Sequence, residues 1–368
     1  VTLHGCGFLA LALVTAWRVV LLPFNETDLV VDEAQYWLWG QNLDWGYYSK
    51  PPLIAWLLRL STTIGFDAPF WIRLPLPLIH AATACTIGLV ARRLFDPGIG
   101  GIAAVAYVTL PGVALGSLLV STDTPLLFFF ALAMLAHLRL AERPSLPGSI
   151  LLGAAIGLGL LSKYAMIYFL LSAAIACALV ASVRIPWRFA GVAAFVASLI
   201  IAPNLLWNVS NSFATLQHTA ENADWQGVGA DFSALGEFWL GQLAVGGPVL
   251  FVLGFLVLLT ARSSGKLYLA CMALPVFVIV SAQAVLSGAN ANWAAIGHLG
   301  VTAAAATTLK SQRKWAIVAL AFNAMISLAL PLAVIFATSL RIGDGELLLD
   351  RHFGQAAVSL KALEIAEA

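Results

Sequence analysis

The residues best suited to chemistry lie close together in the segment VDEAQYWLWGQNLDWGYYSKPPL, residues 31–53. It contains adjacent carboxylates at Asp32 and Glu33, and a lysine, Lys50, directly before two prolines. A carboxylate can accept the proton of a reacting hydroxyl group. The two prolines fix the backbone after Lys50, and a rigidly held ammonium group suits a phosphate. The segment therefore offers a candidate for chemistry, the carboxylate pair, and a candidate phosphate ligand, Lys50.

The two adjacent carboxylates are expected to have different roles. Neighbouring residues on a helix point about 100° apart, so only one of the two should face a given ligand. We assign chemistry to Asp32 and pairing or positioning to Glu33. A structural alternative is that Asp32 caps a short interfacial helix, because Asp32 and Gln35 have the spacing of a capping box.

A second acidic candidate, Asp123, lies in VSTDTPLLFFF at the outer mouth of a later apolar segment. Helix capping is its alternative role, because Thr124-Pro125 suits a helix start. The cations expected on the same face are Arg59, Arg73 and Lys163, in addition to Lys50. A lysine at the end of a span can also merely extend to the membrane interface. We therefore predict phosphate contacts for these four cations, with that alternative open for Lys163.

Aromatic and amide side chains near these charges could bind a sugar or an acceptor. Aromatic faces stack on sugar rings, and asparagine offers neutral hydrogen-bonding groups to hydroxyls. Tryptophan and tyrosine also collect at membrane interfaces, which is the alternative explanation. His218 is a weak candidate for a metal ligand. The candidates for sugar or acceptor binding are Tyr47, Tyr48, Trp225, Asn292 and Trp293.

The composition indicates which kind of protein must position these residues. Hydrophobic residues make up 61% of the 368 residues and charged residues only 10%, and the mean hydropathy is +0.92. Soluble domains carry about 25% charged residues, so the sequence predicts a polytopic membrane protein. The net charge of +1 and the lack of a long basic run give no indication of nucleic acid binding. The four cysteines lie in apolar stretches without metal-site spacing, and we expect them to be small buried residues.

A helix needs about 20 mainly apolar residues to cross a bilayer, and such segments predict about eleven transmembrane helices within residues 1–337. The first is expected to be a retained span rather than a signal peptide. Glycines in GLGLLS and GIGGIAA lie in or beside these segments, so we expect helix packing there rather than nucleotide binding. The segments cover residues 7–24, 72–91, 99–119, 124–141, 147–162, 164–183, 189–207, 236–261, 267–287, 293–309 and 315–337.

Basic residues gather in alternate connectors between these segments. Five connectors hold eleven of the nineteen basic residues, opposed only by Asp96 and Glu142. The positive-inside rule makes these connectors cytoplasmic. Residues 25–71 and 208–235 are then two long periplasmic loops, and the short C-terminal tail, residues 338–368, is also expected outside.

The motifs VDEAQYW, YYSKPPLIAWL, RLP, STDTPLLFF and GLGLLSKY follow one another with the spacing of the GT-C membrane glycosyltransferases. Over roughly residues 10–310 the chain resembles the bacterial protein-mannosyltransferase-like group, which includes the aminoarabinose transferase of lipid A. The resemblance implies an all-α polytopic membrane protein with juxtamembrane helices in the first outer loop. It also implies transfer of a sugar from a polyprenyl-phosphate carrier to a periplasmic acceptor, such as lipid A, another glycan or protein, at the bacterial inner membrane.

The resemblance assigns roles to individual residues. Asp32 matches the acidic catalytic position, Glu33 its partner and Asp123 the second functional acid. Lys50 matches the lysine near the carrier phosphate, and Lys163 matches a recurring position. Some relatives carry a glutamate, implicated in a metal site, where this chain has Ser49; no cofactor is therefore certain, and a divalent metal ion stays open. The expected partners are the lipid-linked donor, the envelope acceptor and membrane lipids, without nucleic acid.

The principal rival class is a transporter or lipid flippase. A transporter would place ionisable residues near the middle of several spans, where this sequence offers mainly Arg18, His80 and His137. A structural scaffold for an envelope assembly is a third interpretation, and it predicts that the charged residues of the outer loops can be replaced without loss of function.

Overall fold

The computed structural model describes residues 3–222, 230–342 and 346–347. Within these residues the chain is helical apart from one antiparallel pair of two-residue strands, β1 (Arg341–Ile342) and β2 (Glu346–Leu347). The α-helices are α1 (Leu3–Leu21), α2 (Val31–Gln41), α3 (Leu53–Ile64), α4 (Pro69–Arg73), α5 (Pro75–Leu94), α6 (Pro97–Val108), α7 (Pro111–Gly116), α8 (Asp123–Glu142), α9 (Leu146–Ser162), α10 (Ile167–Leu179), α11 (Trp187–Ser210), α12 (Ala214–Glu221), α13 (Phe232–Gly246), α14 (Pro248–Leu259), α15 (Ser264–Ser287), α16 (Gly297–Ser311) and α17 (Arg313–Ile335). Four 3-10 turns complete the helical structure: η1 (Leu22–Phe24), η2 (Tyr164–Met166), η3 (Ala181–Val183) and η4 (Ala291–Ala294).

The protein is an all-helical multi-span membrane protein. In the described part, six helical segments are long and apolar enough to cross a bilayer, and the bent pair α13–α14 would make a seventh. Helix length therefore does not establish the eleven spans expected from the sequence. Two predicted spans are divided at a point where a proline occupies the first position of the second helix, a position that proline favours. Pro111 starts α7 after the end of α6, and α13 and α14 meet at 107° around Gly247 and Pro248.

Side-chain caps fix several helix starts on the connectors. The carboxylate of Asp96 accepts hydrogen bonds from the backbone N–H groups of Gly98 and Ile99 at the start of α6. Ser145 caps α9 and Asp231 caps α13 in the same way. These residues accept from backbone donors that the first helical turn leaves free, so the polar connectors end one helix and begin the next.

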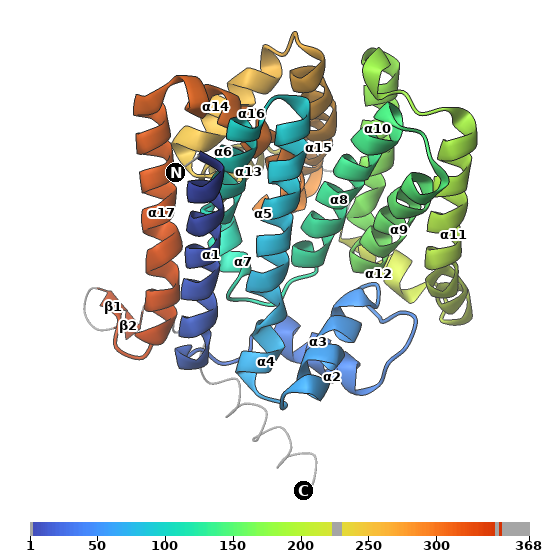
Figure 1. Cartoon of the computed structure of the whole chain (residues 1–368). Helices are drawn as coiled ribbons and strands as arrows, with labels where there is room; N and C mark the ends of the chain where they lie inside the picture. Colours follow the sequence, from blue (N-terminus) through green and yellow to red (C-terminus); the bar gives the residue numbers. More distant parts are fainter. Residues whose placement is uncertain (1–2, 223–229, 343–345, 348–368) are drawn as a thin grey trace, which may run out of the picture.

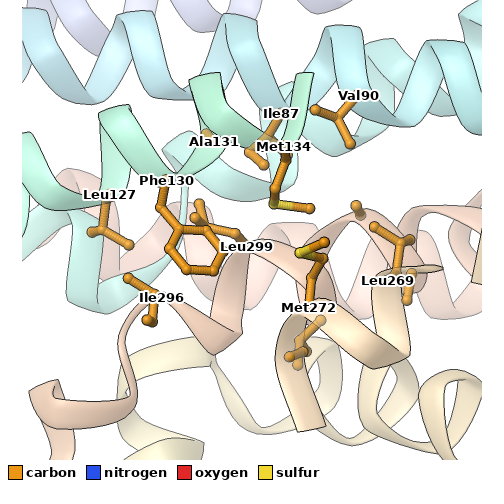
Figure 2. Packing of buried hydrophobic residues seen from close by; sticks show 14 of the residues in the cluster. Ile87, Val90, Leu127, Phe130, Ala131, Met134, Leu269, Met272, Ile296 and Leu299 are labelled. Atoms are coloured by element: carbon orange, nitrogen blue, oxygen red, sulfur yellow. The ribbon is translucent and has the colours of Figure 1, made fainter. Parts of the chain in front are cut away.

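The core is built where α5, α8, α15 and α16 meet (Figure 2). Met134 of α8 lies between Ile87 of α5 and Met272 of α15, and Phe130 of α8 lies beside Leu299 of α16. All of these side chains are buried. Without a hydrophobic driving force between helices in lipid, such close packing is what holds the bundle together.

Glycines allow close helix contacts, as the sequence predicted. A methyl group added at Gly100 of α6 would lie 2.7 Å from the carbonyl oxygen of Gly88 on α5. At Gly157 of α9 it would lie 2.7 Å from Cβ of Ile200 on α11. Both helix pairs therefore approach too closely for any larger residue.

The first long loop contains three short helices. In Figure 1, α2, α3 and α4 lie across one end of the bundle, between the end of α1 and the start of α5. They agree with the juxtamembrane helices implied by the resemblance. The predicted position of the tail, residues 338–368, falls mostly outside the described residues.

Candidate active site

The first turn of α2 separates the two adjacent carboxylates. The helix begins at Val31 after the N-cap residue Val30, so Asp32 lies inside the first turn, and the alternative that Asp32 caps this helix is wrong. Glu33 takes that role instead, because its Oε2 accepts a hydrogen bond of 3.0 Å from the backbone N–H of Val30. Asp32 is exposed, and its Oδ2 accepts a bond of 3.4 Å from the Tyr36 hydroxyl. Asp32 can therefore face a ligand, while Glu33 faces the protein.

Glu33 and Arg73 form a buried ion pair that joins separate elements. Their side chains are 0% and 1% exposed, and Nη2 of Arg73 lies 2.7 Å from Oε2 of Glu33. Oε1 of Glu33 also accepts bonds of 2.9 Å from Nε of Arg73 and from the backbone N–H of Val120. Arg73 further donates to the carbonyl oxygens of Thr27 and Asp28. The predicted phosphate contact of Arg73 would require this pair to open, so its geometry favours a positioning role.

Breaking this pair should destabilise the protein strongly. Glu33→Ala leaves the Arg73 guanidinium buried without its counter-charge, and we expect a loss of about 3–5 kcal/mol in the free energy of unfolding. The measurement is chemical unfolding of the purified protein in detergent. Glu142→Ala is the matched control, because it breaks the Arg93–Glu142 pair, which is 30% and 48% exposed. That change should cost about 0–1 kcal/mol, and equal losses in the two variants would contradict the prediction.

Asp123 is held by side chains from two other segments. Its Oδ1 lies 2.7 Å from Nζ of Lys163, the residue that follows α9. Its Oδ2 accepts a bond of 2.8 Å from Nδ2 of Asn292 in η4. Asp123 is the first residue of α8, and that helix start has no side-chain cap bond. The capping alternative for Asp123 is therefore wrong, and its carboxylate belongs to a polar cluster.

Lys50 lies in the same cluster. Burial, the largest cause, lowers the pKa of Lys50 below its ordinary value of 10.5, and the positive charge of Lys163 lowers it further. The negative charges of Asp32 and Asp123 act on Lys50 in the opposite direction. The structure thus brings together two carboxylates and two ammonium groups that are up to 131 residues apart in sequence (163 − 32).

Tyr36 was not among the residues predicted for the site, although it belongs there. Burial and the nearby negative charges of Asp32 and Asp123 raise the pKa of Tyr36, so its hydroxyl stays protonated and donates to Asp32. Its position four residues after Asp32 is the signal that could have revealed it, since residues i and i+4 share a helix face.

The predicted aromatic residues divide into buried and exposed ones. The Tyr47 ring stacks on Trp39 with centroids 4.7 Å apart. The Tyr47 hydroxyl lies 3.0 Å from the carbonyl oxygens of Trp39 and Asn42, so this side chain holds the loop together. Tyr48 is 60% exposed, and its ring lies 5.0 Å from that of His218 on α12. Of the two tyrosines, Tyr48 is the one that a sugar ring could reach.

The end of α11 fixes the loop that precedes Lys50. Nδ2 of Asn204 donates to the carbonyl oxygen of Trp45 at 2.7 Å, and Nε1 of Trp207 donates to Oδ2 of Asp44 at 2.7 Å. Sequence reasoning did not identify Asn204 or Trp207. The signal was weak, since an amide and a tryptophan at the end of a span are also typical of a membrane interface.

The remaining predicted site residues make their described contacts with other parts of the protein. Arg59 is exposed and donates to Oε1 of Gln41 at 3.0 Å, while Trp293 packs against the main core. Trp225 lies outside the described residues. His218 contacts Tyr48, and the described ranges contain no group of three or more His, Cys, Asp or Glu suited to a metal ion.

Comparison with known proteins shows a family relationship. The model of the dolichyl-phosphate-mannose-protein mannosyltransferase family matches residues 49–207. The chain is 40% identical over 368 residues to the lipid A galacturonosyltransferase RgtD of Rhizobium johnstonii, covering 98% of this chain and 77% of the relative. It is 28% identical over 215 residues to the lipopolysaccharide core galacturonosyltransferase RgtA of the same organism, covering 57% of this chain and 43% of the relative.

Solved structures show the same fold. ArnT from Cupriavidus metallidurans bound to undecaprenyl phosphate superposes with a TM-score of 0.67 at 18% identity, covering 92% of this chain. The Archaeoglobus fulgidus oligosaccharyltransferase gives a TM-score of 0.58 at 15% identity over 90% of this chain. This chain spans 66% of the ArnT chain and 54% of the archaeal one.

The fold is that of the GT-C membrane glycosyltransferases. The chain belongs to the family defined by the dolichyl-phosphate-mannose-protein mannosyltransferases and shared with RgtD. This result confirms the predicted family and the prediction that the protein is a glycosyltransferase.

Proposed function

We propose that the protein transfers a galacturonosyl residue from a polyprenyl-phosphate carrier to lipid A. The similarity to RgtD over nearly the whole chain supports the sugar and the acceptor. The likeness to the ArnT structure that holds undecaprenyl phosphate supports the carrier. The single observation that carries the chemistry is the grouping of Lys50 and Lys163 with Asp32 and Asp123.

The geometry suggests a direct displacement at the anomeric carbon. The acceptor hydroxyl oxygen attacks this carbon, and the bond between the carbon and the phosphate oxygen breaks, with its electron pair leaving on the phosphate. Asp32 accepts the proton of the attacking hydroxyl. Lys50 stabilises the negative charge that grows on the departing phosphate. Because a phosphate is already a good leaving group, the reaction needs no general acid.

The carboxylate of Asp123 is held in place by two neighbouring side chains. Its two oxygens contact Lys163 and Asn292, so it holds the ends of α8 and α9 and η4 around the cluster. We assign Asp123 and Lys163 to the orientation of the donor, and Glu33 and Arg73 to the support of α2 beneath Asp32. Tyr48 and Asn292 are the described residues that suit contact with the sugar or acceptor.

We further propose eleven spans, with the site on the periplasmic side of the bacterial inner membrane. Each predicted span coincides with an apolar helix or a broken helix pair, and the basic connectors lie at the end of the bundle remote from α2–α4 (Figure 1). Labelling of whole cells and lysed cells with a membrane-impermeant maleimide tests this topology. In a cysteine-free background, Thr219→Cys should react in intact cells with a permeable outer membrane, whereas Ser311→Cys should react only after lysis. The reverse pattern would reject the orientation.

Reconstituted transfer tests the proposed activity. Purified protein is incubated with polyprenyl-phosphate galacturonic acid and lipid A, and mass spectrometry follows the gain of one hexuronic acid by lipid A. Asp32→Asn protein is the matched control. Product from another lipid-linked sugar but none from this donor would reject the galacturonosyl assignment. Passage of the lipid-linked donor across the membrane of protein-containing vesicles, without any glycosidic product, would instead support the flippase hypothesis.

Activity should decline on the alkaline side at a pH below 10.5. The pKa of Lys50 is lowered by burial and by Lys163, so its positive charge is lost as pH rises through a value lower than that of an ordinary lysine. The measurement is the pH dependence of kcat/KM for the wild type and for Lys50→Arg. Arginine stays protonated throughout this range, so the variant should lack the alkaline decline. If the alkaline decline were unchanged in Lys50→Arg, it would have to be assigned to a group other than Lys50.

A further inference from the structure

A positively charged cavity lies at the opposite ends of α5 and α8 from the candidate active site. It has a volume of about 340 Å³ and is lined by Leu89, Arg92, Arg93, Leu135 and Arg139. Arg139 lies 16 residues after Asp123 on the same helix, which at 1.5 Å per residue separates their backbones by about 24 Å along the axis. The cavity is therefore distinct from the sugar-transfer site.

Among the residues that the structure describes, the cavity carries more positive charge than its neighbours neutralise. Arg93 forms two hydrogen bonds with Glu142, from Nε to Oε1 at 2.9 Å and from Nη2 to Oε2 at 2.6 Å. Arg92 and Arg139 are exposed, and no hydrogen-bond or ion-pair partner for their guanidinium groups occurs in the described part of the chain. Three guanidinium groups against one carboxylate leave two unmatched positive charges.

The position of the cavity matches the depth of lipid headgroups. Both α5 and α8 belong to segments long and apolar enough to span a bilayer, and the arginines lie near their C-terminal ends. Leu89 lies three residues closer to the middle of the membrane than Arg92 and is 40% exposed. A ligand that fills the cavity would contact guanidinium groups at one end and an apolar side chain at the other.

Simpler roles account for only part of this arrangement. Arginines near helix C-termini interact favourably with the helix dipole, and basic residues at span ends fix the orientation in the membrane. Neither role requires arginines of two helices to converge on one cavity. Basic pockets between transmembrane helices on the cytoplasmic side are a known mode of binding anionic headgroups, and guanidinium groups match the geometry of phosphate oxygens.

We propose that this cavity binds the phosphodiester of an anionic phospholipid, with Arg92 and Arg139 as its ligands and Arg93 held in place by Glu142. The exposed apolar wall at Leu89 favours a lipid over a free phosphate ion. The lipid would bind at the surface of α5 and α8, in the leaflet opposite the active site.

Lipid titration of the purified full chain tests the proposal. Native mass spectrometry measures the binding of phosphatidylglycerol and of phosphatidylcholine to the wild type, to Arg92→Gln/Arg139→Gln and to Arg313→Gln/Lys314→Gln. The last variant is the matched control, because it also removes two exposed positive charges, at the start of α17. These charges lie on the same side of the bundle as the cavity, since the neighbouring Lys310 pairs with Asp96, which follows α5. The wild type should prefer phosphatidylglycerol, and the loss of both cavity arginines should weaken its binding about 30-fold.

The outcomes separate the alternatives. Weakened phosphatidylglycerol binding in the cavity variant alone supports the site, whereas an equal effect in the control variant would show general charge attraction and overturn it. Displacement of phosphatidylglycerol by inorganic phosphate at equal concentration would also overturn the lipid assignment in favour of a free phosphate. If the double variant does not fold, Arg139→Gln alone should weaken phosphatidylglycerol binding about 5-fold, and unchanged binding in it would reject the proposal.

Discussion

Replacement of Asp32 by asparagine is expected to lower kcat about 10²- to 10⁴-fold, because the amide cannot accept the proton of the acceptor hydroxyl. The fold should be preserved, since Asp32 is exposed and the one hydrogen bond of its side chain within the described residues is the 3.4 Å contact with Tyr36. The measurement is single-turnover transfer to lipid A, together with the melting temperature of the variant.

Asp67→Asn is the matched control for this prediction. Asp67 is an exposed carboxylate in the same loop, where it accepts a hydrogen bond of 2.9 Å from Nε1 of Trp37. The control should transfer sugar at nearly the parental rate. Parental activity in folded Asp32→Asn protein would remove the general base from the mechanism, and the proton acceptor would then have to be sought at Asp123.

The second large effect is expected for Lys50→Gln. This change removes the ammonium group that is proposed to stabilise the negative charge on the departing phosphate. Loss of one such stabilising group costs about 10²- to 10³-fold in kcat. The reduction should be larger in kcat than in donor affinity, because the phosphate gains charge as its bond to the sugar breaks. Measurement of kcat and of donor KM separates the two effects.

Two further variants define the role of Lys50. Lys50→Arg keeps the charge and should recover part of the activity, although the larger guanidinium must fit the half-buried position. Lys266→Gln removes a cation from a different connector and should leave transfer unchanged. A fall in donor affinity with an unaltered kcat in Lys50→Gln would show that Lys50 binds the donor equally well in the ground state and the transition state.

Several features of the site were predictable because they are local in sequence. Asp32 and Lys50 belong to one loop of fewer than fifty residues (25–71), so the charge pattern alone assigned them to one side of the membrane. The different directions of Asp32 and Glu33 followed from helix geometry, and the structure shows one exposed and the other buried. The close packing at the glycine-rich stretches was predictable for the same reason, since small residues on an apolar helix indicate a contact surface.

The partners of these residues were not predictable. Glu33 pairs with Arg73, forty residues away, and Asp123 binds Asn292, which is 169 residues away. The sequence offered Arg73 as a phosphate ligand, but it could not show that Arg73 is buried against Glu33. Nothing in the spacing of two residues indicates which helices become neighbours, because many arrangements of apolar helices bury similar surfaces.

The sequence by itself determined that this chain is a multi-span membrane protein, that half of its acidic residues gather in residues 25–71 and 208–235, and that the first of these loops carries both Asp32 and Lys50. These properties depend on the cost of placing charges in hydrocarbon and on local helix geometry. Only the tertiary structure decided which charges meet around Asp123, which arginine supports α2 and where the helices break. Those outcomes depend on how α8, α9 and η4 pack together, and packing is a property of the whole bundle.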